Sequence, residues 1–214
     1  MATFESSLLE TLRGKIGNFI IYKVKQQYRI RTAPTEYRDA NTPEQQANRN
    51  RLTACVRFYQ RLRETPLRDA WRTAADKAAT SSGYSLYLKT NMGGLLPDCT
   101  IRDVSRITLC PASGLKTADN MIATRNTDGT VTLTWENHAG KQSPRNTDRL
   151  AVAYLNENRS FTIRFVNPLP VCRDDERATF TTENTPGIAT HLYCYFISRE
   201  GDAYTPDTYI KLND

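Results

Sequence analysis

The spacing of apolar residues changes near residue 100, and this change constrains the fold more than any other feature. Before that point, Leu52, Cys55, Tyr59 and Leu62 recur at the three- and four-residue spacing of a helix. After it, apolar and polar residues alternate, as they do along half-buried strands. A chain that passes from helical to strand periodicity is expected to have an α+β fold, with helices first and a β-rich part second.

Eight segments of the second part have strand-like patterns. These segments are Val104–Cys110, Met121–Arg125, Thr130–Glu136, Leu150–Leu155, Phe161–Val166, Ala178–Thr182, Leu192–Ser198 and Tyr204–Lys211. Asp128-Gly129 is a typical hairpin turn between two of them. The short strands predict an immunoglobulin-like antiparallel β-sandwich. Trp135, on a strand with Val131 and Leu133, is expected at the centre of its core.

Capped helices are the clearest local signal of the first part. Thr42-Pro43-Glu44-Gln45 combines a capping threonine, a proline at the first helical position and a glutamine that completes a capping box. This helix is expected to run to about Arg63. Thr65-Pro66 repeats the device before a second helix, which is expected to end near Ala79. Because the link is short, the two helices are expected to be antiparallel, and Tyr84–Asn91 fits either a third helix or a strand.

Two short strands are expected before the helices. Ile16–Lys23 is apolar and rich in β-branched residues, and Tyr28–Thr32 alternates apolar and basic residues. Together they predict a β-hairpin, with Arg29 and Arg31 on one face of its second strand. The segment that follows has no periodicity, and Pro34 favours an extended conformation before it. We therefore expect an extended segment between the hairpin and the first helix.

Charge is distributed unevenly along the chain, whose formal net charge is +6. Residues 1–90 hold 16 Lys and Arg against 8 Asp and Glu, whereas residues 91–214 hold 13 against 15. The basic first part is expected to meet nucleic acid or an acidic protein surface. Charge and periodicity together predict two domains, a basic hairpin-and-helix region over residues 1–98 and a β-sandwich over residues 99–214.

Arginines crowd the first predicted helix and make it a candidate for binding a partner. Such a helix can contact phosphates, contact an acidic protein surface or present an ordinary solvated face, and the sequence leaves these interpretations open. The basic strand before it either adds to the sheet of a neighbouring molecule or belongs to an ordinary hairpin. The candidate partner-binding residues are Arg29, Arg31, Pro34, Tyr37, Arg49, Arg51, Arg57 and Arg61.

No sequence pattern predicts catalysis or a bound cofactor. The chain lacks GxSxG, HExxH and a phosphate-binding loop, and its only histidines are His138 and His191. The five cysteines are irregularly spaced without a CxxC pair, so we expect small buried side chains rather than disulfides or a zinc site. No catalytic, cofactor-binding or metal-binding residue is predicted. With no membrane-spanning apolar run and no signal-peptide pattern, we expect a cytoplasmic starting point.

An ordered set of motifs resembles one protein family. The motifs are Gly14-Lys15-Ile16-Gly17-Asn18, Arg29-x-Arg31-x-x-Pro34, Thr42-Pro43-x-Gln45-x-x-x-Arg49, Ala70-Trp71 and Val131-x-Leu133-x-Trp135. From about residue 14 onward the chain resembles an uncharacterised family of proteins from gut Bacteroidales and related mobile elements. The resemblance implies no known activity. The proline-capped helical segments also resemble pieces of phage structural proteins.

These observations lead to three hypotheses about function. The first is a non-enzymatic structural protein of a phage or phage-like particle, present in many copies as an accessory, connector or decoration protein. Its partners would be other particle proteins, and it would reach the virion after assembly in the host cytoplasm. The alternative is a cytoplasmic nucleic-acid-binding protein that uses the arginine-rich helix. The third is an enzyme of an unfamiliar kind that uses the sandwich loops.

Overall fold

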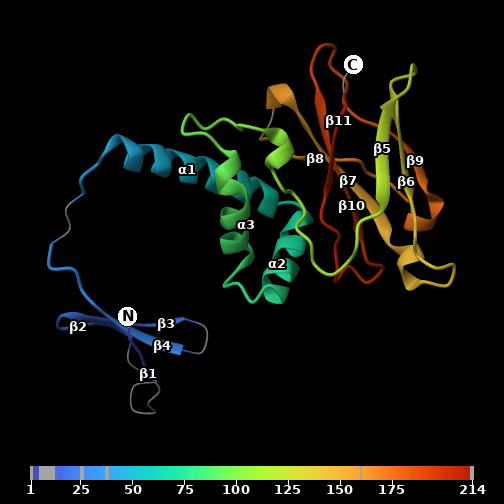
Figure 1. The fold of residues 1–214 in the computed structure, drawn as a ribbon. Coiled ribbons are helices and arrows are strands. Elements are labelled where there is room, and N and C mark those ends of the chain that lie inside the picture. The colour runs from blue at the N-terminus through green and yellow to red at the C-terminus, as the bar shows by residue number, and fades with distance from the viewer. Residues whose placement is uncertain (1, 5–12, 25–26, 37–38, 160, 213–214) are drawn as a thin grey trace. The chain divides into compact units, whose positions relative to one another are not determined.

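The computed structural model describes residues 2–4, 13–24, 27–36, 39–159 and 161–212 (Figure 1). The chain divides into two compact units, Met1–Pro43 (unit 1) and Glu44–Asp214 (unit 2). The fold is α+β with a β-rich C-terminal region, and every pair of strands in the described sheets is antiparallel. The fold class predicted from the change in periodicity is therefore confirmed.

Unit 1 is a four-stranded antiparallel sheet with the order β1-β4-β3-β2. Its strands are β1 (Ala2–Phe4), β2 (Gly14–Ile16), β3 (Phe19–Val24) and β4 (Gln27–Thr32). The β3–β4 pair is the predicted hairpin. The single strand predicted over Ile16–Lys23 is wrong, because the chain turns at Gly17 and Asn18. Gly17 has a φ of 55°, which glycine adopts without steric cost.

Helices form the first part of unit 2. The α-helices are α1 (Pro43–Arg63), α2 (Leu67–Lys77) and α3 (Gly83–Asn91), and the 3-10 helices that follow are η2 (Met92–Gly94), η3 (Val104–Arg106), η4 (Pro144–Thr147), η5 (Glu157–Arg159) and η6 (Arg173–Asp175). The first helix has its predicted bounds. Tyr84–Asn91, for which both a helix and a strand were open, lies in helix α3. The Ser82 hydroxyl caps this helix by accepting a hydrogen bond from the Ser85 N–H. No helix in the described ranges is both long and apolar enough to span a membrane.

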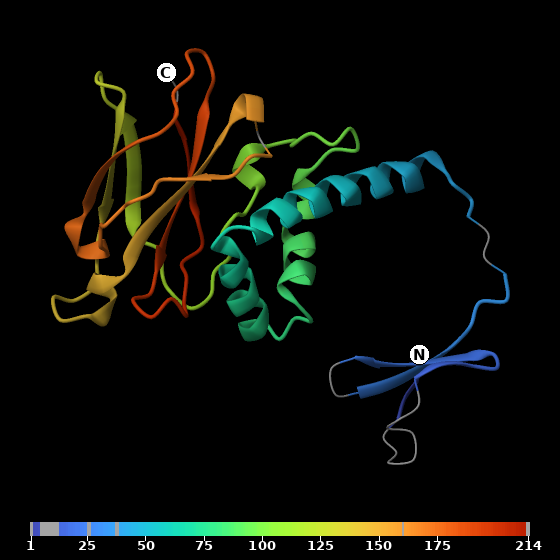
Figure 2. The same ribbon diagram turned by 180° about the vertical axis from the view of Figure 1, so that it is seen from behind.

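The antiparallel helix pair is made by α2 and α3, whereas α1 runs across them (Figures 1 and 2). The expectation that α1 and α2 would form this pair is thus wrong. At the start of α3, a Cβ on Gly83 would lie 3.0 Å from the backbone of Trp71 in α2. The absence of a side chain at Gly83 lets the two helices approach closely, which favours their pairing.

Two antiparallel sheets form the sandwich of unit 2, with the orders β11-β10-β7-β8 and β5-β6-β9. The strands are β5 (Asp119–Arg125), β6 (Thr130–Glu136), β7 (Arg149–Asn156), β8 (Arg164–Phe165), β9 (Arg177–Thr181), β10 (Thr190–Ile197) and β11 (Thr208–Leu212). Their order corresponds to strands G, F, C and C′ against A, B and E of an immunoglobulin-like sandwich. Leu133 and Trp135 of β6 share one core with Leu192 and Phe196 of β10, as predicted for Trp135.

The four-stranded sheet of unit 2 (β11-β10-β7-β8) is buried on both faces. Along β10, Leu192 faces the sandwich core, whereas Tyr193 and Tyr195 pack in a second core with Phe58 and Trp71 of the helices. Unit 2 therefore has three layers, formed by the helices, the four-stranded sheet and the three-stranded sheet (Figure 1). The domain boundary predicted at residues 98 and 99 would divide the core that the helices share with the four-stranded sheet of unit 2. The compact units instead meet at residues 43 and 44.

The strand predicted over Val104–Cys110 is also wrong. The Asp103 carboxylate accepts hydrogen bonds from the N–H and the hydroxyl of Ser105 at 2.9 and 2.6 Å, and this arrangement starts a 3-10 turn. Further on, the N–H of Leu109 donates to the Asp207 carboxylate at 2.7 Å. These backbone N–H groups therefore donate to side-chain carboxylates, whereas in a strand they would donate to the backbone of a neighbouring strand. The other seven predicted strands each overlap an observed strand.

Three of the five cysteines are buried apolar residues, as expected. Cys55 and Cys110 lie in the core between helices and sheet, and Cys194 lies in the sandwich core. Burial raises the pKa of the Cys55 thiol to about 11, so this thiol stays protonated at neutral pH. Cys99 and Cys172 are partly buried.

Candidate functional site

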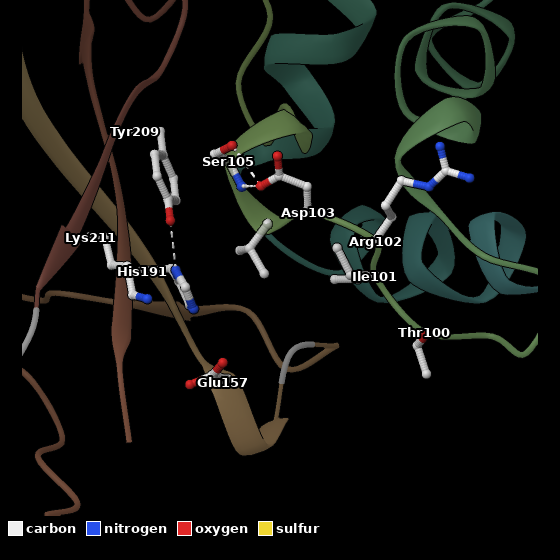
Figure 3. Close-up of a pocket in the computed structure, with 10 residues that line it drawn as sticks. Thr100, Ile101, Arg102, Asp103, Ser105, Glu157, His191, Tyr209 and Lys211 are labelled. Carbon is white, nitrogen blue, oxygen red and sulfur yellow. Dashed lines mark hydrogen bonds between the residues drawn. The ribbon is translucent and has the colours of Figure 1, made fainter. Parts of the chain in front are cut away.

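A polar hollow of about 540 Å³ lies within unit 2, where the connection after the helices faces the four-stranded sheet (Figure 3). We call it the His191 hollow. One wall is the segment Thr100–Ser105, and the other is formed by Glu157, His191, Tyr209 and Lys211. Its volume lies in the range of small-molecule sites, which is roughly 300–1,000 Å³.

Strand alternation places the sheet side chains in this hollow. His191 is one of a row on β10 that continues through Tyr193 and points away from the sandwich core. On the neighbouring strand β11, Lys211 pairs with His191 and Tyr209 pairs with Tyr193. Because cross-strand partners share a face, these side chains extend from the same side of the sheet. Glu157 begins η5, directly after β7.

His191 is nearly inaccessible to solvent, with 4% of its surface exposed. Its Nδ1 lies 2.9 Å from the Tyr209 hydroxyl, whereas its Nε2 has no hydrogen-bond partner among the residues that the structure describes. Burial lowers the pKa of His191; Glu157 and Asp103 oppose this shift, and Lys211 adds to it. The imidazole is therefore neutral at neutral pH. Burial also raises the pKa of Tyr209, so its phenol is protonated.

Hydrogen bonds hold the opposite wall in place. The contacts of Asp103 with Ser105 lower the pKa of Asp103 and keep its carboxylate ionised. The Tyr193 hydroxyl donates to the carbonyl of Val104 at 2.7 Å and fastens the segment to the sheet. The hollow thus has two anchored walls, with exposed Arg102, Glu157 and Lys211 side chains around it. This arrangement is suited to binding a polar molecule.

The sequence did not indicate this hollow, because its residues come from four separate segments. The signal that the sequence does carry is His191, a histidine directly before the apolar strand predicted over Leu192–Ser198. In the described part of the chain, no group of three or more His, Cys, Asp and Glu side chains is arranged to hold a metal ion. The other histidine, His138, is exposed and lies near Asp119 and Glu136, at 3.4 and 3.5 Å.

The predicted partner-binding residues of unit 1 fall on strand β4 and the segment after it. Arg29 and Arg31 lie on one face of the sheet, as expected, because they are two residues apart on the strand. Lys15 of β2 lies on the same face, because Lys15 and Arg31 both pair with Ile20 of β3. Pro34 is exposed after the strand. Tyr37 lies outside the described residues.

The predicted arginines of α1 do not form one cluster. Arg57 and Arg61 are exposed, lie one turn apart and line a second hollow of about 230 Å³ together with Ala54, Cys99 and Phe161. Arg51 is partly buried and donates to the side-chain oxygen of Asn48 at 3.2 Å. Arg49 is exposed on the first half of the helix.

The first half of α1 contributes no fully buried side chain, since the first such residue is Ala54. Residues 43–53 are polar on nearly every side, and Leu52 is exposed. A helical segment without a packed face gains little stability from its own unit. This half of the helix therefore lies outside the packed core of unit 2.

The comparison with protein-family models identifies the chain. The model described as "Family of unknown function (DUF6266)" matches residues 11–211. The chain belongs to this family. The DUF6266 match includes strands β2 to β4 of unit 1, the helices and nearly all of the sandwich, whereas β1 lies before the matched range. It confirms the resemblance to an uncharacterised family that the ordered motifs predicted.

Other comparisons add little to the DUF6266 assignment. No curated protein matches the chain. A match to a solved structure described as "Myokine structure" covers 46% of this chain and 95% of the other chain, with 10% sequence identity and a TM-score of 0.35. A likeness at this level assigns no function.

Proposed function

We propose that this DUF6266 protein is a non-enzymatic assembly protein of a phage or phage-like particle, present in many copies as an accessory, connector or decoration protein. Its partners are other structural proteins of the particle, and it reaches the virion after assembly in the host cytoplasm. An origin in gut Bacteroidales or their mobile elements belongs to the same proposal. The observation that carries it is the exposed apolar hairpin tip of unit 1.

This hairpin tip joins β2 to β3 and is formed by Ile16, the turn residues Gly17 and Asn18, and Phe19. Ile16 and Phe19 are register partners, and 47% and 48% of their surfaces are exposed. By register they share a sheet face with Ile21 and, across β4, with Ile30. One apolar face therefore runs from buried Ile21 to an exposed edge of the sheet.

Exposed apolar pairs of this kind favour binding to another protein. Ile21 and Tyr28 are the buried apolar residues of unit 1 within its described part, so this sheet has a small core. Covering the exposed halves of Ile16 and Phe19 would contribute about 1 kcal/mol each, a modest gain for one copy. In a particle with many copies, repeated weak contacts add through avidity and yield stable attachment. Weak single contacts therefore suit a multi-copy component.

The extended segment after β4 and the exposed half of α1 support the same proposal. Both offer backbone or polar side chains outside the packed core of unit 2. Arg57 and Arg61, at their shared hollow, offer a pair of cations to an acidic protein surface. These surfaces supply contacts without requiring any chemistry from the chain.

The test is co-sedimentation of tagged full-length chain with particles from producing cells. Replacing both Ile16 and Phe19 by serine removes the apolar tip and should reduce the particle-bound fraction several-fold. The matched control is Ile122→Ser, because Ile122 is an exposed isoleucine of unit 2. The proposal fails if wild-type chain never sediments with particles, or if the tip and control variants behave alike.

A second candidate function, binding nucleic acid, is favoured by the opposite face of the same sheet. Lys15, Arg29, Arg31 and Tyr22 share that face by register. Cations beside an aromatic ring suit single-stranded nucleic acid, which binds through phosphate contacts and base stacking. The arginine-rich helix offers a separate basic surface.

Salt-dependent affinity for a single-stranded oligonucleotide tests this alternative. Changing Lys15 and Arg31 to alanine should make the negative slope of log affinity against log salt shallower by about 1.4, if both side chains contact phosphates. A variant with Arg49, Arg57 and Arg61 changed to alanine tests the helix in the same assay. An affinity that neither variant alters would exclude both surfaces.

A further inference from the structure

One ring nitrogen of the buried His191 side chain lacks a hydrogen-bond partner among the described residues. Its Nε2 has no partner within the described part of the chain, while Nδ1 is held by the Tyr209 hydroxyl. Buried polar atoms without partners are rare in folded proteins and often mark a bound water or ligand. Because Nε2 carries the proton in one neutral tautomer and a lone pair in the other, a hydroxyl group satisfies it in both.

Charge around the His191 hollow is balanced. Arg102 and Lys211 are opposed by Asp103 and Glu157. An ionic ligand would meet as many like charges as opposite ones, so the hollow has no clear preference for either sign. A neutral ligand avoids this conflict. Its polar groups need both donors, which the two cations supply, and acceptors, which Glu157 supplies.

The hollow also has apolar surface. Ile101 and Val104 lie on the wall that faces the sheet, beside the hydroxyls of Thr100 and Ser105. In Figure 3 the carboxylate of Glu157 is turned toward the His191 ring, on the side away from Tyr209. A sugar ring combines hydroxyls, which donate and accept, with C–H faces that pack on apolar side chains.

We propose that the His191 hollow binds a neutral polyhydroxylated ligand of the saccharide class. The hydroxyls of the ligand bond to Glu157, Lys211 and the imidazole of His191, and its C–H surface packs on Ile101 and Val104. The ligand is either a free sugar or the terminal residue of a glycan, since both present the same chemistry. This inference is independent of the proposed role in particle assembly.

The experiment is a titration of ¹⁵N-labelled full-length protein, followed by amide chemical shifts. The probes are D-glucose, D-mannose, D-galactose and N-acetyl-D-glucosamine at millimolar concentrations, together with their methyl glycosides. The methyl group blocks the anomeric hydroxyl as a glycosidic bond does. Binding of free sugars alone assigns a free sugar, whereas binding of the glycosides as well assigns a glycan terminus. Glucose 6-phosphate and glucosamine serve as the anionic and cationic comparisons.

Saturable shifts should appear at the amides of residues 100–105 and 190–192. Glu157→Ala should weaken the affinity about tenfold, because it removes a charged hydrogen-bond acceptor. Glu200→Ala, another exposed glutamate of unit 2, is the matched control and should leave the affinity unchanged. The proposal is overturned if no neutral sugar binds, if only the charged analogues bind, or if Glu157→Ala leaves the affinity unchanged.

Discussion

The carboxylate of Asp207 accepts a hydrogen bond from the backbone N–H of Leu109 at 2.7 Å, which joins the segment before β11 to the connection after the helices. The same oxygen accepts a longer bond from the N–H of Cys110, and the N–H of Asp207 donates back to the carbonyl of Cys110 at 3.0 Å. These contacts replace the strand predicted around Leu109 and fix the path of the chain between the layers of unit 2.

Removing the Asp207 carboxylate should destabilise unit 2. In Asp207→Ala the N–H groups of Leu109 and Cys110 lose their acceptor inside the protein, and an unmet buried donor costs about 1–3 kcal/mol. We expect the free energy of unfolding to fall by about 2 kcal/mol in urea denaturation. Glu200→Ala, in the turn after β10, measures the effect of removing a nearby exposed carboxylate. Equal stabilities of Asp207→Ala and wild type would contradict the assignment.

Asp207 should also make stability depend on pH. Burial raises its pKa to about 6, although the bonds from Leu109 and Cys110 oppose the shift. Between about pH 4 and pH 6 the folded state holds a proton that the unfolded state has lost, so the contribution of Asp207 to stability falls as pH rises. Below pH 4 and above pH 6 the contribution is constant.

The variant Asp207→Asn isolates this dependence, because an amide has no proton to lose and keeps one acceptor oxygen. Relative to wild type, it should gain about 2 kcal/mol of unfolding free energy between pH 4 and pH 7. Denaturation curves of both proteins across this range provide the measurement. Parallel stability profiles for the two proteins would show that Asp207 titrates normally in the fold.

The buried pair of Asp148 and Arg173 supports the end of the sandwich. The Arg173 side chain lies 3.5 Å from Asp148, donates to the carbonyl of Lys116 at 2.8 Å and covers the ring of Phe196 at 4.5 Å. Burial raises the pKa of Asp148 despite the adjacent arginine. Asp148→Ala leaves a cation buried without its partner and should cost about 3–5 kcal/mol.

The contrasting variant is Glu183→Ala, which removes the ion pair between Glu183 and Arg164. Glu183 is largely exposed, so this change should cost at most about 1 kcal/mol. Thermal or urea unfolding of both variants measures the difference. If the two substitutions cost the same, the account of a buried, desolvated pair at Asp148 is incorrect.

The shared core between helices and sheet predicts which fragments fold. A fragment of residues 44–214 keeps all three layers of unit 2 and should give a dispersed NMR spectrum. A fragment of residues 99–214 exposes Tyr193 and Tyr195, which pack against Phe58 and Trp71 in the whole unit. It should aggregate or remain unfolded. A stable fragment of residues 99–214 with a dispersed spectrum would instead support the domain boundary expected from periodicity.

Local signals predicted the elements of this fold better than they predicted its layers. The proline at residue 43 and the change in period correctly placed α1 and most strands. The sequence did not reveal that the helices pack against the sandwich. The strand that they cover, β10, is apolar at successive positions. Such a pattern reports burial on both faces, but it does not identify what covers each face. The choice of α2 and α3 as partners depended on the contact at Gly83, which is a property of tertiary packing.

The candidate site was less predictable than the fold. Arg57 and Arg61 share a hollow, as helical spacing allows. Arg51 instead donates to the side chain of Asn48 on the preceding turn, a contact that a count of charges does not predict. The His191 hollow combines segments separated by up to about 110 residues in the chain. His191 and Lys211 are brought together by the pairing of β10 with β11, which no local pattern specifies.

The measurement that tests the central claim most directly is gradient sedimentation of the native protein in lysate from its source cells. The gradient is run at low and high salt, with and without nuclease. A particle component should migrate with large species that survive nuclease and contain other structural proteins. Migration as a small species that becomes larger only when nucleic acid is present would contradict the assembly role and favour nucleic-acid binding.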